Sequence, residues 1–133
     1  MSNSVTHLIP VGFYCELRGG RPHEPSLRAA VQSSASPHEV RIIQYLNAGE
    51  LMIATAGVVS DVLEPKFGII GPPHILTDGT YAWPAIFAHY VERHHVRPPE
   101  EFVSHMIANA WTVPTRIDVL SLKLDRNAPQ APQ

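Results

Sequence analysis

The sequence predicts an α+β domain with a small, mostly antiparallel sheet and three or four helices packed on one side of it. Two observations lead to this fold class. Asp78-Gly79 is typical of a tight turn between short β-forming runs, because Gly79 accepts a positive φ and Asp78 tolerates the neighbouring left-handed conformation. Helix starts are indicated at residues 36–39 (SPHE) and 99–101 (PEE), which combine caps, prolines and acids at positions that helix N-termini favour.

Composition favours one folded domain. The chain has 133 residues, of which 44% are hydrophobic and only 17% charged, enough for one sizeable core. We therefore predict a single domain over residues 1–126 and a disordered tail over residues 127–133 (NAPQAPQ). A formal net charge of −2 provides no basic field for phosphate backbones, which argues against a nucleic-acid partner.

The start of the chain carries no recognisable targeting signal. The first twenty residues have no basic region followed by a continuous apolar run, and no later segment has the length of a membrane span. A single cysteine, Cys15, cannot form an internal disulfide bond. These features predict a cytoplasmic protein that has no membrane partner, and they leave its oligomeric state open.

The first half of the chain reads as a strand, two helices and a second strand. We predict a strand over Val11–Leu17, a short helix capped by Ser26, and a helix over Pro37–Asn47. In the longer helix Ser36 and Glu39 form a capping box, and Gly49 ends it in the left-handed conformation. Its buried stripe is expected to comprise Val40, Ile42, Ile43 and Leu46. A buried strand is predicted over Leu51–Ala56.

The second half is predicted to begin with an irregular region, Gly57–Gly71, that contains one helical turn and a short strand. A hairpin then pairs His74–Thr77 with Thr80–Trp83, and Pro84 begins a helix. A second helix follows from Pro99, and the last strand is predicted within Arg116–Leu124.

Histidines are concentrated near these two helices, which raises the question of a metal site. His89 and His94 are five residues apart on a predicted helix, so their side chains are expected to diverge, and no HExxH or CxxC motif is present. We therefore predict surface or capping histidines and no metal. Phosphate-binding glycine motifs are also absent, and Cys15 lies in an apolar segment typical of buried thiols. The sequence indicates no cofactor and no catalytic residue.

Aromatic residues outside the helical stripes are the candidates for partner binding. Tyr81 and Trp83 have no periodic reason to be fully buried, and large aromatic rings are favoured at protein interfaces. For Trp83, packing beneath the helix begun by Pro84 is the alternative. The acidic side chains expected to form a rim around this surface are Asp78, Glu92 and Glu100.

Several short motifs carry a resemblance to a known group. They are Tyr45-Leu46-Asn47-Ala48-Gly49, Thr77-Asp78-Gly79, Trp83-Pro84, Tyr90-Val91, His95-Val96, Pro99-Glu100-Glu101-Phe102 and His105-Met106. Over about residues 12–114 the chain resembles small bacterial proteins of undetermined activity, which look like the single-domain immunity proteins encoded beside bacterial toxins. The resemblance implies that the chain binds and neutralises a cognate toxin. The alternative is a small enzyme whose site lies in the Gly57–Asp78 region.

Overall fold

The computed structural model describes residues 5–126, so the predicted tail at residues 127–133 lies outside the described residues. The helices are α1 (Leu27–Ala30), α2 (Glu39–Asn47), α3 (Phe87–His94) and α4 (Glu100–Ala108), with 3-10 turns η1 (Pro65–Phe67) and η2 (Val119–Ser121). The strands are β1 (Thr6–Pro10), β2 (Glu50–Ile53), β3 (Val59–Ser60), β4 (Ile69–Gly71), β5 (Ile75–Thr77), β6 (Tyr81–Pro84) and β7 (Leu122–Leu124). The predicted α+β class is confirmed.

The main sheet is mixed, so the prediction of a mostly antiparallel sheet is wrong. Its strand order is β2-β5-β6-β1-β7, with antiparallel pairing of β2, β5 and β6 and parallel pairing of β1 with both β6 and β7. The N-terminal strand thus lies between a central strand and the last strand of the chain. Local sequence patterns do not specify such long-range parallel pairs, because their residues are distant in sequence.

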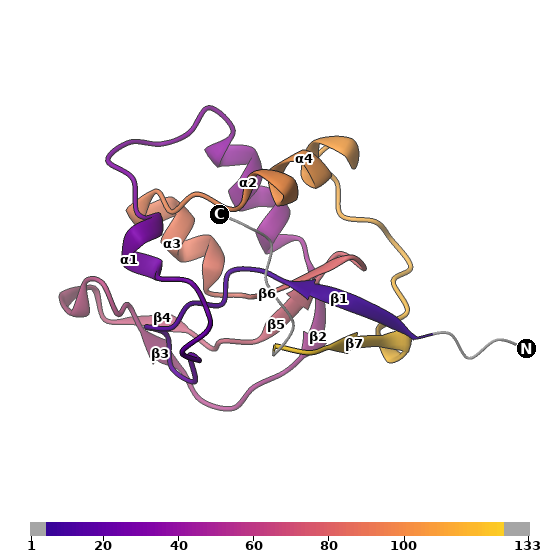
Figure 1. Ribbon diagram of the computed structural model, residues 1–133, viewed down its shortest axis with the longest axis horizontal. Helices are drawn as coiled ribbons and strands as arrows, with labels where there is room; N and C mark the ends of the chain where they lie inside the picture. The colour runs from indigo at the N-terminus through magenta and orange to yellow at the C-terminus, as the bar shows by residue number, and fades with distance from the viewer. Residues whose placement is uncertain (1–4, 127–133) are drawn as a thin grey trace, which may run out of the picture.

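The helices lie together on the upper side of the strands in the view of Figure 1, and α2 packs against both α3 and α4. The core between helices and sheet is rich in aromatic side chains. Its largest fully buried members are Trp83, Tyr14, Tyr45, Tyr90, Phe87 and Phe102. Within residues 5–126, none of the helices is long and apolar enough to cross a membrane.

The predicted turn at Asp78-Gly79 is confirmed. It joins β5 and β6, which pair antiparallel, and Gly79 has a φ of 93°. The Asp78 carboxylate accepts hydrogen bonds from the backbone N–H groups of Thr80 and Tyr81 at 2.9 and 2.7 Å. The turn is therefore fixed by side-chain hydrogen bonds as well as by glycine.

The predicted strand over Val11–Leu17 is wrong. The first strand is instead Thr6–Pro10, and the chain then turns, with the N–H of Leu17 donating to the carbonyl of Tyr14 at 3.1 Å. Tyr14 itself is fully buried. Apolar character in this segment therefore reflects burial of a loop in the core, which a strand-forming composition does not distinguish from a strand.

Helix α2 is present, but its predicted ends and buried stripe are partly wrong. Glu39 does not close a capping box; its carboxylate lies 2.9 Å from the ring of His95. Val40 is exposed, and Tyr45 takes a buried place in the stripe. Gly49 has no positive φ, and its requirement is space: a Cβ there would lie 2.6 Å from a ring carbon of Trp83.

The remaining elements match the prediction in kind more closely than in extent. Ser26 caps α1 by accepting from the N–H of Ala29 at 3.3 Å. Strand β2 is the predicted second strand, but it lies at the edge of the sheet, where Leu51 is exposed rather than buried. Pro84 ends β6 and does not begin a helix, and the last strand is limited to Leu122–Leu124.

Candidate functional site at the β3–β4 hairpin

Strands β3 and β4 form a two-stranded antiparallel sheet separate from the main sheet. This hairpin, residues 58–71, projects at the left of Figure 1, and a single short turn, η1, lies between its strands. A two-stranded hairpin alone is marginally stable in water. Contacts with the rest of the chain must therefore hold it in place.

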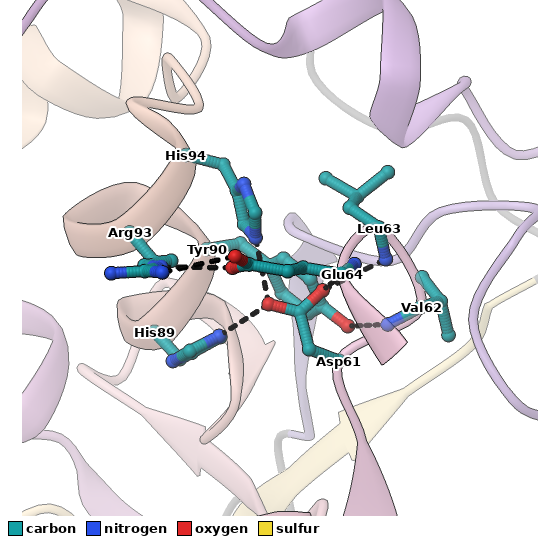
Figure 2. A network of polar contacts seen from close by, with 8 residues as sticks. All are labelled: Asp61, Val62, Leu63, Glu64, His89, Tyr90, Arg93 and His94. Atoms are coloured by element: carbon teal, nitrogen blue, oxygen red, sulfur yellow. Dashed lines mark hydrogen bonds and ion pairs between the residues drawn. The ribbon is translucent and has the colours of Figure 1, made fainter. Parts of the chain in front are cut away.

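A buried carboxylate, Asp61, links the hairpin to helix α3. One carboxylate oxygen, Oδ1, accepts hydrogen bonds from the backbone N–H groups of Leu63 and Glu64 at 2.8 and 2.9 Å. The other, Oδ2, lies 2.7 Å from Nε2 of His89 and 2.7 Å from Nε2 of His94. Figure 2 shows the two imidazoles reaching this one oxygen from different directions.

Electrostatics favour the charged form of this carboxylate. Burial by itself raises the pKa of Asp61, but hydrogen bonds from His89 and His94 and from two backbone N–H groups outweigh it and lower the pKa to about 2. The Asp61 side chain has no exposed surface. At neutral pH the site therefore contains a buried negative charge that is stabilised by four N–H donors.

Further contacts of helix α3 with the hairpin surround Asp61. The hydroxyl of Tyr90 accepts a hydrogen bond from the backbone N–H of Val62 at 3.0 Å. Arg93 donates two hydrogen bonds to Glu64, at 2.9 and 3.0 Å, and its guanidinium lies over the ring of Phe67. Figure 2 shows this ion pair beside Asp61. One helix thus holds the hairpin through several polar contacts.

The predicted divergence of His89 and His94 is wrong. Five residues turn an α-helix to positions about 140° apart around its axis. His94 is the last residue of α3, however, and the hairpin places Asp61 where both long side chains reach it. The contacts join residues 28 and 33 positions apart in sequence, and no pattern within α3 indicates Asp61 as their partner.

Large apolar side chains are exposed on the hairpin. Val58, Phe67 and Ile69 are 50%, 46% and 66% exposed. Single exposed apolar residues are ordinary on protein surfaces, but three of them on one small element make the hairpin a candidate contact surface.

A cavity of about 400 Å³ opens between β3 and the core. Its apolar walls include Val58, Val59 and Val62 from the hairpin and Phe13, Ile75 and Ile86 from the rest of the chain. Thr55 also lines it, and the buried hydroxyl of this residue has no hydrogen-bond partner among the described residues. The cavity is thus mainly apolar, with one unsatisfied polar group.

The residues predicted to bind a partner lie elsewhere, and most are buried. Tyr81, Trp83 and Asp78 are 5%, 0% and 2% exposed, so their side chains offer almost no surface to a partner. No periodic pattern in the sequence requires Tyr81 to be buried, but its ring packs against that of Phe102, with the two ring centroids 4.5 Å apart. Glu92 and Glu100 are exposed, as a rim would require.

Trp83 follows the alternative interpretation in being buried beneath a helix, although the helix is α2 rather than one begun by Pro84. Its indole N–H donates to the carbonyl of Leu46 at 3.1 Å. Asp78 forms a second buried polar cluster, in which its Oδ2 accepts from the hydroxyl of Tyr45 at 2.6 Å and lies 3.0 Å from the ring of His105. Asp78, predicted from the sequence to lie both in the turn and in a partner-binding rim, thus makes contacts inside the fold.

Comparison with known protein families, with curated proteins and with solved structures gives no match for this chain. The site is therefore interpreted from its own geometry. Three features of the hairpin need explanation together: the polar contacts that fix it to α3, its exposed apolar side chains and the cavity beneath it.

Proposed function

We propose that this chain is a non-enzymatic binding protein whose β3–β4 hairpin contacts a protein partner, and that the partner is a cognate bacterial toxin that it neutralises. The observation that carries the proposal is the combination of exposure and fixation in one element. Phe67 and Ile69 are exposed, while Asp61 in the same hairpin is fully buried and held by α3.

Fixation matters because binding is opposed by the ordering of flexible segments. A hairpin held in one conformation before contact loses less entropy on association, which raises affinity without new contacts. The ion pair with Glu64 further restrains Arg93, whose guanidinium stacks on the ring of Phe67. Aromatic and arginine side chains are the residues that contribute most at protein interfaces.

The cavity behind β3 supports the same function. Interface residues that contribute most to binding are usually side chains inserted in pockets where water is excluded. A volume of about 400 Å³ with walls formed by Val58, Val59 and Ile86 accommodates an apolar side chain of a partner. The hairpin and the cavity then form one surface.

The class of partner follows from the resemblance of the sequence to proteins encoded beside bacterial toxins. A formal net charge of −2, and exposed Glu92 on the helix that holds the hairpin, suit a partner with a basic face. The proposed setting is the cytoplasm. Asp78, Tyr81 and Trp83 have structural roles in this proposal.

A small enzyme with its site in the Gly57–Asp78 region is the second candidate. The cavity favours it, because the unpaired hydroxyl of Thr55 is a polar group that a small ligand would satisfy. The two candidates differ in which residues matter. A ligand site depends on Thr55 inside the cavity, whereas a protein interface depends on Ile69 outside it.

The test is a toxicity assay with matched variants. The chain is co-expressed with the toxin candidate encoded by the neighbouring gene, and growth and the Kd of the purified pair are measured. We expect the unmodified chain to restore growth and Ile69→Asp to weaken binding by at least about 10-fold, or ~1.4 kcal/mol. Leu120→Asp is the matched control, since Leu120 is also exposed but lies in η2, directly before β7, and Figure 1 shows β7 on the opposite side of the view from the turn that connects β3 and β4.

Two outcomes would contradict the proposal. Full protection by a folded Ile69→Asp variant would place the interface away from the hairpin. A folded, unmodified chain that neither binds the neighbouring toxin nor restores growth would remove toxin neutralisation as the function. Loss of function in Thr55→Val but not in Ile69→Asp would favour the enzyme.

A further inference from the structure

We propose that Asp61, His89 and His94 form a binding site for one divalent transition-metal ion, with zinc as the metal that suits the ligands best. The inference goes beyond partner binding and does not depend on it. It concerns the ligands themselves: two imidazole nitrogens and one carboxylate oxygen lie within 4.8 Å of one another, and the two nitrogens face the same oxygen.

The chemical types of these atoms fit zinc. Zinc is bound in proteins by imidazole nitrogen at about 2.0–2.1 Å and by carboxylate oxygen at about 2.0–2.2 Å, and two histidines with one carboxylate form a known kind of three-ligand set. Calcium and magnesium prefer oxygen ligands only. His89 and His94 both present Nε2 to Asp61, so one ion can contact all three side chains.

The distances from the two nitrogens to Oδ2 have to lengthen when an ion binds. Each nitrogen lies 2.7 Å from Oδ2, which is a hydrogen-bond distance. In a tetrahedral zinc site, ligand atoms about 2.0–2.1 Å from the ion are ~3.3 Å apart, so each nitrogen–oxygen distance has to lengthen by about 0.6 Å. The ring proton then resides on Nδ1 of each imidazole, and Nε2 binds the ion.

The carboxylate is already oriented by its surroundings. Oδ1 of Asp61 is held by two backbone N–H groups, which leaves Oδ2 directed at the histidines. Hydrogen bonds of this kind to a ligand increase metal affinity, because they fix the ligand before the ion arrives. The hairpin thus supplies a preoriented oxygen, and α3 supplies two nitrogens.

The site is reachable from solvent. The side chains of His89 and His94 are each 16% exposed, while that of Asp61 is fully buried. The neighbouring carboxylate, Glu64, is occupied by its two hydrogen bonds from Arg93. Three protein ligands therefore leave a fourth position for water or an external group, as in zinc sites that are not purely structural.

The competing explanation is a cluster of hydrogen bonds that only fastens the hairpin. It accounts for the 2.7 Å distances, but it does not require two imidazoles at one oxygen. His95 provides the internal comparison, since its ring lies 2.9 Å from the Glu39 carboxylate as a single imidazole–carboxylate pair. If His89 and His94 only formed hydrogen bonds, the Asp61 cluster would differ from the His95–Glu39 pair only in having two imidazoles instead of one. It would then bind metal no better than that pair.

The experiment uses untagged full-length chain stripped with a chelator. Zinc chloride is added in a calorimeter, and Co²⁺ is added in a parallel visible-absorption measurement. We expect one equivalent of Zn²⁺, an increase in Tm on addition of Zn²⁺, and Co²⁺ bands typical of four-coordinate rather than six-coordinate cobalt. Loss of a residue that only hydrogen-bonds to a metal ligand lowers metal affinity by up to ~100-fold. His94→Gln removes a ligand itself, so we expect it to lower the affinity for Zn²⁺ by more than that.

His95→Gln is the matched control and is expected to retain one equivalent of Zn²⁺ at unchanged affinity. No Zn²⁺ heat with no change in Tm overturns the proposal, as does equal loss of affinity in His94→Gln and His95→Gln. If His94→Gln fails to fold, the Co²⁺ spectrum of the unmodified chain decides, and a six-coordinate spectrum overturns the site. The assay contains no partner protein, so its failure leaves toxin binding untouched.

Discussion

The carboxylates of Asp61, in the β3–β4 hairpin, and Asp78, in the β5–β6 turn, have the same local geometry and different distant partners. In each residue Oδ1 accepts the backbone N–H groups two and three positions later in the chain, and neither side chain has exposed surface. Oδ2 of Asp78 contacts Tyr45 and His105, which come from two different helices. Oδ2 of Asp61 contacts two residues of one helix.

The difference shows how one turn motif serves two purposes. Asp78 connects the centre of the main sheet to α2 and α4, and its partner Tyr45 also accepts a hydrogen bond from Asn109 at 3.0 Å. Asp61 connects a small separate hairpin to α3. Loss of the first contact should therefore affect the whole fold, and loss of the second should affect mainly the hairpin.

The largest effect is expected from Asp78→Ala. It leaves the buried hydroxyl of Tyr45 without its acceptor and removes the two hydrogen bonds that fix the turn. Because each buried group left unpaired costs about 1–3 kcal/mol, we expect the free energy of unfolding to fall by about 3 kcal/mol. Urea unfolding followed by circular dichroism measures it. Tyr45→Phe, which removes only one partner, should cost less, and equal losses would contradict a central role for Asp78.

A smaller and local effect is expected from Asp61→Ala. With chelator present, we expect the stability of the hairpin to fall by about 2 kcal/mol, because His89 and His94 lose their shared acceptor and the turn loses two hydrogen bonds. Hydrogen exchange monitored by NMR should show faster exchange of the Leu63 and Glu64 amides. The Tyr81 amide serves as the control and should keep its protection. Equal acceleration at all three amides would remove the distinction between a local and a central carboxylate.

The sequence predicted the local structure around Asp78 better than that around Asp61. Asp78-Gly79 has a turn signal that depends only on adjacent residues, and the turn is present with Gly79 at positive φ. Helix starts near Ser26 and Pro99 are local in the same sense, and both helices are present. These local signals predicted the turn and two helix starts, whereas the equally local signals for a capping box at Ser36 and Glu39 and for a left-handed Gly49 failed, because Glu39 pairs with His95 and Gly49 packs against Trp83.

Features that depend on contacts between distant segments were not. The parallel pairing of β1 with β6 and β7 and the core position of Tyr14 depend on such contacts. The candidate site is of this kind, since the irregular region around Asp61 gave no sign that it faces α3. Spacing alone suggested that His89 and His94 diverge, because it takes no account of a third residue between them.

A third carboxylate, Glu16, tests whether burial is the reason that Asp61 and Asp78 contribute strongly to stability. It accepts three hydrogen bonds at the start of α1, from the hydroxyl of Ser26 at 2.7 Å and from the backbone N–H groups of Leu27 and Arg28 at 2.6 and 3.1 Å. Burial by itself raises the pKa of Glu16, but these hydrogen bonds outweigh it and lower the pKa to about 2. With the thiol of Cys15, whose Sγ lies 3.4 Å from Oε1, Glu16 has as many donors as Asp61, yet it is only partly buried.

The smallest effect is therefore expected from Glu16→Gln. Because the folded-state pKa of Glu16 lies below its ordinary value of 4.5, its contribution is present above pH 4.5 and is lost as the pH falls towards 2. Solvent screening limits this contribution to about 1 kcal/mol. The free energies of unfolding of the unmodified chain and of Glu16→Gln, measured with urea, should differ by that amount at pH 6 and converge near pH 2. Taking the difference between the two proteins cancels the titration of their other acidic groups. A constant difference across this range would show that Glu16 acts through packing rather than charge. A difference as large as that of Asp78→Ala would mean that the number of hydrogen-bond donors, rather than burial, sets how much a carboxylate stabilises this fold.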